Sequence, residues 1–517
     1  MSERVRFPKQ TGYGQIFDDS IRRCPDREAI VFGSWRITYR ELGQHICRAA
    51  HFLEARGLKR GDRAAIISRN CPEYLILEFA MYKLGIVPVK FNWRLTADEM
   101  IYLMDFNQVR CAFLRVENPV WGQQLLDHYA GKLPIFVLEG VEEADSTLMR
   151  ALADQPDDPV ETVLPDGDVA CHAHTSGTTG HAKTVVYTHG GMLNEIEAVA
   201  DMYGYEDGQR YQFIAQLFHS ASIGAHLSLC TGGTIVLMCS FSADTYMQSL
   251  VRERVTAISV VPTVLKWILD EMEKKHYDLS GLRVIRYSTC PIPPILLDRA
   301  MKSLNCVFYQ SYGMTEMCSI VTALLPEDHF SDGGRHLTTV GRPIPGAAVK
   351  IVDEEGRDCP VGETGEIYVQ GPGHMKEYLG KEELTRQRTQ GGWYHTGDMG
   401  FLDADGYLSI SGRMDDMIIS GGENIYPGEV TNVIMRLNND VSEVAVYGVP
   451  DETWGEQVKA SVVLVPGSRL TGEEIRRYCR DNMPHFQVPR EVEILPELPK
   501  NPSGKVLIQE LKRRSQK

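Results

Sequence analysis

The sequence lacks the signals of several protein classes. Its twelve cysteines are scattered and none forms a CxxC pair, so the usual motifs of zinc and dithiol centres are missing. No run approaches the ~18 apolar residues that a membrane helix needs. Residues 1–12 are polar and contain no apolar signal core. Together these absences predict a cytoplasmic protein in a reducing compartment.

Positive charge is also in short supply. Lys and Arg number 54 against 69 Asp and Glu, which gives a formal net charge of -15. This balance argues against nonspecific nucleic-acid binding. It leaves an anionic small molecule open, because glycines, backbone amides and a few local cations can build a nucleotide site. Internal repeats and low-complexity tracts are absent.

The length of 517 residues predicts at least two domains, because a single core stops growing well below that size. As far as residue 325, amphipathic helical segments alternate with short apolar segments, which is typical of an α/β domain with a largely parallel sheet. Short segments between residues 349 and 411, punctuated by Gly, Pro and Asp, predict a smaller β-rich unit. The later pattern is compact α+β, so we predict domains at 1–414 and 415–517.

Several individual elements follow from hydrophobic periodicity. Helices are expected at residues 39–57, 72–84, 427–437 and 471–482, and the basic tail at 498–517 is expected to be partly helical. Strands are expected at residues 62–68, 85–90, 234–239, 257–261, 282–288, 349–352, 365–370, 407–411, 441–449 and 459–465. Residues 154–168 are rich in Pro and Asp and indicate a connector.

The segment at residues 175–183 suits polyphosphate binding. Its glycines let the backbone approach a ligand closely, its hydroxyls and amides can donate to phosphate oxygens, and its lysine adds positive charge. The same composition fits a flexible surface loop, and the segment does not match a Walker A motif. It consists of Thr175, Ser176, Gly177, Thr178, Thr179, Gly180, His181, Ala182 and Lys183.

Two further segments place a carboxylate at a turn. In residues 312–316 (YGMTE), Glu316 could bind Mg²⁺, a hard ion that prefers oxygen ligands. In residues 394–398 (YHTGD), Asp398 could accept hydrogen bonds from the ribose hydroxyls of a nucleotide. Each segment alone also fits an ordinary solvated turn.

Two segments nearer the C-terminus suggest movement between domains. Residues 412–416 (GRMDD), followed by residues 421–424 (GGEN), could form a hinge, although a plain linker has the same composition. Residues 499–505 (PKNPSGK) place Lys505 after a turn rich in Pro and Gly. That lysine could neutralise charge that develops during nucleotidyl transfer, or it could simply belong to an exposed basic tail.

Taken together and in this order, the five segments resemble the acyl-adenylate-forming superfamily, which includes acyl-CoA ligases, adenylation domains and firefly luciferase. The resemblance covers essentially the whole chain. It implies an α/β fold in which a large N-terminal domain contains two mixed sheets with helices and a β-barrel. It also implies a small, mobile α+β C-terminal domain.

The resemblance assigns roles to individual residues. Residues 175–183 become the phosphate loop, Lys505 the adenylating lysine, Glu316 and Thr175 the Mg²⁺ site, and Asp415 the hinge. His219 matches a histidine at the mouth of the acyl pocket, with a catalytic role, although a packed or surface residue is an open alternative there and at Trp454. The implied nucleotide and CoA contacts are Tyr312, Gly313, Thr315, Asp398, Arg413, Gly421, Gly422 and Trp454.

Two stretches depart from the family pattern. The phosphate loop has Ala182 and Thr184 where the family usually has Pro and Gly. The stretch that usually reads GGAP has Ser288, Thr289, Cys290 and Pro291, so side chains replace glycines and should narrow the wall. We therefore expect a compact or polar acid rather than a long fatty acid. The implied pocket residues are His219, Ser288, Thr289, Cys290, Gly313 and Cys318, with Ser319 beside them.

The resemblance implies an acid–thiol ligase that uses ATP, Mg²⁺ and coenzyme A with a small-molecule carboxylic acid. One alternative is a stand-alone adenylating enzyme that passes the acyl group to a carrier-protein thiol, an amine or nitrite. A second is a nucleotide-binding protein without turnover, which retention of Lys505, Glu316 and Asp398 argues against. A homodimer follows only by family analogy, and no nucleic acid or membrane span is expected.

Overall fold

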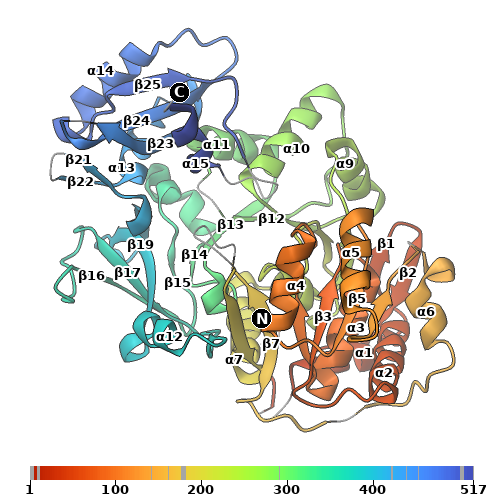
Figure 1. Cartoon of the computed structure of the whole chain (residues 1–517). Helices are drawn as coiled ribbons and strands as arrows, with labels where there is room; N and C mark the ends of the chain where they lie inside the picture. The colour runs from red at the N-terminus through yellow and green to blue at the C-terminus, as the bar shows by residue number, and fades with distance from the viewer. Residues whose placement is uncertain are drawn as a thin grey trace.

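The computed structural model describes most of the chain (Figure 1). The described residues are 5–8, 12–140, 142–160, 162–175, 182–289, 292–420, 423–437, 439–451, 453–500 and 506–515. Within them, no helix is long and apolar enough to cross a membrane.

The larger of two mixed sheets has nine strands. Six neighbouring strands from β13 to β1 pair in parallel, and antiparallel strands flank them. In sheet order the strands are β15 (Arg342–Pro343), β14 (Thr322–Leu324), β13 (Val307–Tyr312), β12 (Val284–Ser288), β11 (Ala257–Val260), β9 (Arg210–Phe213), β10 (Thr234–Leu237), β1 (Glu28–Phe32) and β2 (Trp35–Thr38).

The second mixed sheet has seven strands, and two of them, β7 and β8, lead into and out of the predicted phosphate loop. Its order is β18 (Glu377–Tyr378), β8 (Thr184–Thr188), β7 (Val169–His174), β4 (Val87–Lys90), β3 (Arg63–Ile67), β5 (Cys111–Leu114) and β6 (Ile135–Val137). The edge strand β18 pairs antiparallel with β8, although it lies far along the chain. This pairing brings Tyr378 beside the base of the loop.

Helices pack around these sheets. The predicted helices begin and end at capping residues, Pro or Gly in the sequence. Thr38 caps α2 through a capping box, and α3 begins with Pro72 and ends at Gly85 in the left-handed region. All of α3 is buried, so it forms part of the core. The helices are α1 (Asp18–Arg23), α2 (Tyr39–Ala55), α3 (Pro72–Leu84), α4 (Ala97–Phe106), α5 (Pro119–Tyr129), α6 (Thr147–Leu152), α7 (His189–Tyr203), α8 (Ser222–Cys230), α9 (Ala243–Arg252), α10 (Pro262–Lys274) and α11 (Pro294–Ser303).

The predicted β-barrel region is a four-stranded antiparallel sheet. Its strands are β16 (Ala348–Val352), β17 (Gly365–Gln370), β19 (Tyr394–Leu402) and β20 (Leu408–Arg413), and α12 (Glu382–Arg388) lies in the chain between β18 and β19. Short 3-10 helices connect elements throughout: η1 (Tyr13–Gln15), η2 (Glu143–Asp145), η3 (Thr315–Met317), η4 (Glu327–His329), η5 (Ser331–Thr338), η6 (Gln390–Gly392), η7 (Met414–Asp416) and η8 (His485–Gln487).

A smaller α+β unit completes the chain and gathers at one end of the molecule (Figure 1). It contains β21 (Ile418–Ser420), β22 (Glu423–Ile425), α13 (Pro427–Ile434), β23 (Val441–Asp451), β24 (Gly455–Leu464), α14 (Gly472–Asn482), β25 (Glu491–Ile494) and α15 (Ile508–Ser515). The α/β fold with a smaller C-terminal α+β unit is therefore as predicted. The domain boundary between residues 414 and 415 stays a prediction.

Candidate active site

The predicted phosphate loop joins two antiparallel strands. β7 and β8 pair along their length as far as His174 opposite Thr184. Beyond that pair the Thr175 amide donates to the Lys183 carbonyl oxygen at 3.0 Å, which closes the neck of the loop. The tip residues Ser176, Gly177, Thr178, Thr179 and Gly180 lie outside the described residues, so their phosphate contacts stay predictions.

Lys183 and Glu316 converge on one tyrosine. The Lys183 ammonium lies 4.9 Å from the centre of the Tyr378 ring. The Tyr378 hydroxyl donates to Glu316 Oε1 at 2.5 Å and lies 2.9 Å from the Tyr394 hydroxyl. Burial lowers the pKa of Lys183, while the Glu316 carboxylate acts in the opposite direction. The structure therefore brings a cation to the ring and a carboxylate to the hydroxyl of one side chain, although the three residues come from distant segments.

Glu316 is buried in η3, directly after the strand β13. The turn that places it requires glycine at position 313. A Cβ atom there would lie 1.8 Å from the Ser319 carbonyl oxygen, far closer than any contact allows. Tyr187 also fixes the turn, because its hydroxyl donates to the Thr315 carbonyl oxygen at 2.5 Å. Gly313 and Thr315 thus shape the backbone that presents Glu316.

Asp398 forms the centre of a second polar group. The Tyr312 hydroxyl donates to Asp398 Oδ2 at 2.5 Å, and Arg413 Nε lies 3.4 Å from Asp398 Oδ1. Asp398 and Arg413 face each other across the antiparallel pair β19 and β20. Burial raises the pKa of Tyr312, and the Asp398 carboxylate raises it further, so the phenol stays protonated as a donor. Three residues predicted to contact the nucleotide are thereby brought together.

The Glu316 surroundings suit a shared Mg²⁺ site. Among the described residues, no group of three or more His, Cys, Asp and Glu side chains could hold a metal ion on its own. One carboxylate is nevertheless a common protein contribution to Mg²⁺ when substrate phosphates and water complete the shell. The donor chemistry of Glu316 fits that arrangement, and the role of Thr175 in it stays a prediction.

The predicted acyl-pocket residues lie in two groups. His219 and Cys318 line one small cavity, together with Tyr187 and Lys90. Ser288 ends β12, and Thr289 follows it with φ of 78°. Cys318 also has a positive φ, 61°, so two of the proposed pocket residues hold a backbone conformation that favours glycine. Cys290 lies outside the described residues.

His219 lines the small cavity and is partly exposed to solvent. Desolvation by the surrounding protein lowers its pKa, and the positive charges of Arg94 and Lys90 act in the same direction. The ring is therefore neutral near pH 7. A neutral imidazole can orient a substrate by hydrogen bonding, but it brings no charge to the acyl pocket.

The predicted hinge and CoA residues lie in the smaller unit and at its start. Asp415 falls in η7, directly after β20, and its side chain is outside the description. Gly421 and Gly422 also lie outside the described residues. Trp454 is 43% exposed, and the Arg490 guanidinium stacks over its ring at 4.9 Å. An exposed aromatic ring beside a cation suits a nucleotide ligand, and CoA contact there stays a prediction.

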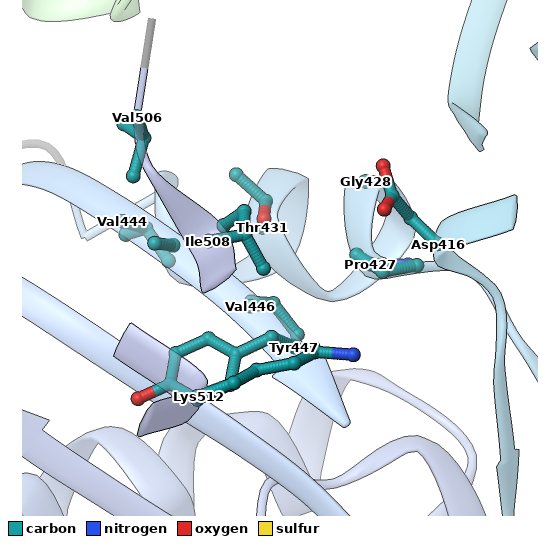
Figure 2. A pocket seen from close by; sticks show the side chains of 11 residues that line it. Asp416, Pro427, Gly428, Thr431, Val444, Val446, Tyr447, Val506, Ile508 and Lys512 are labelled. Atoms are coloured by element: carbon teal, nitrogen blue, oxygen red, sulfur yellow. The ribbon is translucent and has the colours of Figure 1, made fainter. Parts of the chain in front are cut away.

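Lys505 lies outside the described residues, but the ends of its turn are placed. Lys500 pairs with Val506 in an antiparallel bridge, and the Lys500 ammonium contacts Glu443 at 2.7 Å. A second cavity lies within this unit, between side chains of β23 and the segment that follows the turn (Figure 2). Its lining residues run from Asp416 to Lys512 and include none of the residues predicted to contact the nucleotide. This cavity therefore belongs to the packing of the smaller unit.

Comparison with known families agrees with this geometry. A family model described as AMP-binding enzyme matches residues 17–379, which include the predicted phosphate loop and Glu316. A second, described as AMP-binding enzyme C-terminal domain, matches residues 429–505. The chain belongs to the AMP-binding enzyme family. The resemblance to the acyl-adenylate-forming superfamily is thereby confirmed.

Individual relatives of this AMP-binding enzyme span nearly its whole length. A fatty acid–[acyl-carrier-protein] ligase from Streptomyces coeruleorubidus is 34% identical over 99% of this chain and 98% of the relative. A feruloyl-CoA synthase from an Amycolatopsis species is 35% identical over 95% and 97%. The solved amide bond synthetase McbA from Marinactinospora thermotolerans is 28% identical, with a TM-score of 0.88 and coverage of 97% and 99%.

Sequence reasoning missed several side chains of the AMP-binding enzyme's site. Tyr378 and Tyr394 share the Glu316 contacts, yet neither stands out locally. Glu195, in the middle of α7, is fully buried and accepts a hydrogen bond from the Ile320 amide at 2.9 Å, directly behind the Glu316 turn. A glutamate on the apolar face of a helix was the available signal. Lys90, at the end of an apolar strand, was a comparable signal.

Proposed function

We propose that this AMP-binding enzyme is an ATP-dependent carboxylate–CoA ligase, an acid–thiol ligase that forms an acyl-adenylate and then an acyl-CoA. The observation that carries the proposal is the convergence of Lys183 and Glu316 on Tyr378. It supports a site that combines a cation able to bind phosphates with a carboxylate of the type that binds Mg²⁺. Nucleotidyl transfer needs that combination.

In the first half-reaction a carboxylate oxygen attacks the α-phosphorus of ATP. The new acyl–phosphate bond forms as the bond to pyrophosphate breaks. Lys183 and the loop amides would hold the polyphosphate, Lys505 would stabilise charge on the transferred group, and Asp398 would accept hydrogen bonds from the ribose. Mg²⁺ bound at Glu316 would supply further charge neutralisation on the phosphates.

In the second half-reaction the CoA thiol gives its proton to water, and the thiolate attacks the acyl carbonyl carbon. The thioester bond forms as the bond to AMP breaks. Rotation of the smaller domain about Asp415 would withdraw Lys505 and bring Gly421, Gly422 and Trp454 to the CoA side. The mobility of that domain, its boundary at residue 415, the use of Mg²⁺, the cytoplasmic location and a homodimer all belong to this proposal.

The relatives differ in the acceptor that takes the acyl group from the adenylate. The named relatives include a carrier-protein ligase, a CoA synthase and an amide bond synthetase. The exposed Trp454 with its stacked Arg490 favours CoA here, because an adenine ring and its phosphates would find both a flat surface and a positive charge. A carrier-protein thiol or an amine is the alternative.

The test incubates the purified protein with ATP, Mg²⁺ and a broad panel of carboxylic acids, with CoA, a holo-carrier protein or an amine as acceptor. We expect AMP, pyrophosphate and an acyl-CoA from at least one acid. AMP with only the carrier-linked or amide product would move the acceptor to the alternative. No AMP from any acid would refute the ligase proposal.

A lysine variant separates the two half-reactions. Lys505→Ala should abolish adenylate formation, yet it should still convert a synthetic acyl-adenylate and CoA to acyl-CoA. Lys500→Ala is the matched control, because it removes a neighbouring lysine that pairs with Glu443 at the base of the same turn. Equal effects of the two substitutions would mean that the turn has only a structural role.

A further inference from the structure

A buried charged group faces the cavity beneath the Glu316 turn. The cavity is lined by His219 and Cys318, by Tyr187, and by the polar side chains of Lys90, Ser222 and His226. It adjoins the reaction site directly, because Tyr187 bonds to the backbone of Thr315 and Cys318 follows Glu316 by two residues. An acyl group that extends away from the nucleotide would enter here.

Lys90 is held in place by two partners. Its ammonium lies 2.9 Å from Glu78 Oε1 and donates to Ser222 Oγ at 3.0 Å. Both charged side chains are almost completely buried, with 5% of the Lys90 side chain and none of the Glu78 side chain exposed. An ammonium has three N–H donors. Two serve Glu78 and Ser222, and the described residues provide no further partner, so the third can serve a group inside the cavity that Lys90 lines.

Glu78 compensates the charge of Lys90 and is itself fully hydrogen-bonded. Besides Lys90, it accepts from the Tyr82 hydroxyl at 2.9 Å and lies 3.2 Å from His226 Nε2. Burial alone would raise the pKa of Glu78, but Lys90 and His226 outweigh it and lower that pKa to about 2. Burial alone would lower the pKa of Lys90, and Glu78 reverses that direction. The pair is therefore ionised but carries no net charge.

A buried ion pair contributes little to the stability of a protein. Well-packed apolar residues of similar volume often serve as well or better, because both charges must be desolvated. A second ion pair of a buried lysine can be compared with this one. Lys83, on the same helix as Glu78, pairs with Asp18 at 2.8 Å. That pair is not part of the cavity lining, and Asp18 is 33% exposed. Lys90 therefore differs from Lys83 in that it lines the cavity.

We infer that Lys90 and Ser222 bind an uncharged oxygen, a keto or hydroxyl group, at the far end of the carboxylic acid substrate. The inference rests on the proposed ligase function and specifies its substrate class. A purely alkyl acid would leave the Lys90 donor without a partner, which is costly in a buried site. A second carboxylate would approach the negative charge of Glu78 with no net positive charge to offset it.

The test compares acids of equal carbon number with the wild-type enzyme. Hexanoate, 5-oxohexanoate and adipate form one set, and matching sets with shorter and longer chains extend it. The measurement is kcat/KM for pyrophosphate release. We expect the oxo acid of the best-fitting set to exceed both the alkyl acid and the dicarboxylic acid by about tenfold or more.

Lys90→Met should remove this preference, because methionine is also unbranched and only one atom shorter but has no donor. The oxo acid should lose about tenfold relative to the alkyl acid. Lys83→Met is the matched control and should keep the wild-type preference. If Lys90→Met does not fold, Ser222→Ala provides the second variant. It removes one hydroxyl without breaking the ion pair, and it should reduce the preference several-fold.

The outcomes distinguish this inference from the ligase proposal. A wild-type enzyme that activates alkyl and oxo acids equally would overturn the inference and leave the ligase function standing. The same holds if folded Lys90→Met, or Ser222→Ala in its place, keeps the wild-type preference. If no acid yields AMP, the ligase function fails and the substrate assignment fails with it.

Discussion

The Tyr378 hydroxyl donates a 2.5 Å hydrogen bond to the Glu316 carboxylate across 62 residues of sequence. The contact exists because the two-residue strand β18 pairs with β8 at the sheet edge. The same tyrosine presents its ring to Lys183. Tyr378 is therefore a positioning residue for two groups that the proposed adenylation step uses.

Tyr378→Phe should lower the rate of AMP formation by about 10- to 100-fold. The substitution keeps the ring beside Lys183 but removes a hydrogen bond to a charged group, worth about 1.5–3 kcal/mol. Initial rates at several Mg²⁺ concentrations provide the measurement, and the Mg²⁺ requirement should rise because Glu316 is less well oriented. Tyr407→Phe is the control, since it removes a similar 2.6 Å bond to Asp328. An equal loss of AMP-formation rate in both variants would show that Tyr378 has only a structural role.

Asp398→Asn should raise the KM for ATP by about tenfold. The change removes the charge that receives the Tyr312 hydroxyl and the Arg413 guanidinium, and hydrogen bonds to charged groups are the stronger ones. Steady-state kinetics with ATP varied would measure it. Asp353→Asn alters a carboxylate that serves only a turn of the same sheet among its described contacts, and it should leave the KM unchanged. An unchanged KM in Asp398→Asn would contradict a ribose contact.

Thr289→Gly should stabilise the protein and admit bulkier acids. Thr289 has φ of 78°, a conformation that costs a β-branched residue about 1–3 kcal/mol and costs glycine almost nothing. Loss of the Thr289 side chain would also widen the predicted acyl pocket. Thermal unfolding and the acid panel test the two effects. Ser288→Gly serves as control, because Ser288 is not in the left-handed region and should bring no relief of strain. A Thr289→Gly protein less stable than wild type would contradict the strain argument.

Glu195→Gln should become more stable than wild type as pH rises. Burial raises the pKa of Glu195 from 4.5 to about 8, so the folded protein holds a proton that the unfolded chain releases. Wild-type stability should therefore fall between about pH 4.5 and pH 8, by about 1.4 kcal/mol per pH unit. Glutamine has no proton to lose, so its advantage should grow through that window and then level off.

Chemical denaturation at a series of pH values would measure this difference. Glu197→Gln is the control, because it removes a carboxylate from the partly exposed side of the same helix and should keep the wild-type slope. A pH-independent difference between Glu195→Gln and wild type would show that the carboxyl is ionised in the folded protein throughout.

Local signals predicted many elements of this fold from the sequence. The helix at residues 72–84 was predicted to the residue, because Pro72 opens it and Gly85 ends it in a conformation that glycine tolerates. The strand at residues 365–370 was also predicted exactly as β17. Five ordered motifs likewise identified the family, since each depends on residue types that the nucleotide chemistry requires at fixed positions.

Only the tertiary structure decided which side chains meet. Neither the pairing of β18 with β8 nor the ion pair of Lys90 with Glu78 leaves a local trace, because both depend on sheet order and helix packing. The same limit applies to pKa values. The position of Glu195 on an apolar helix face can be read from the sequence, but only its complete burial in the folded protein raises its pKa to about 8. Residue type determines what chemistry is available, and desolvation and distance determine which of it is used.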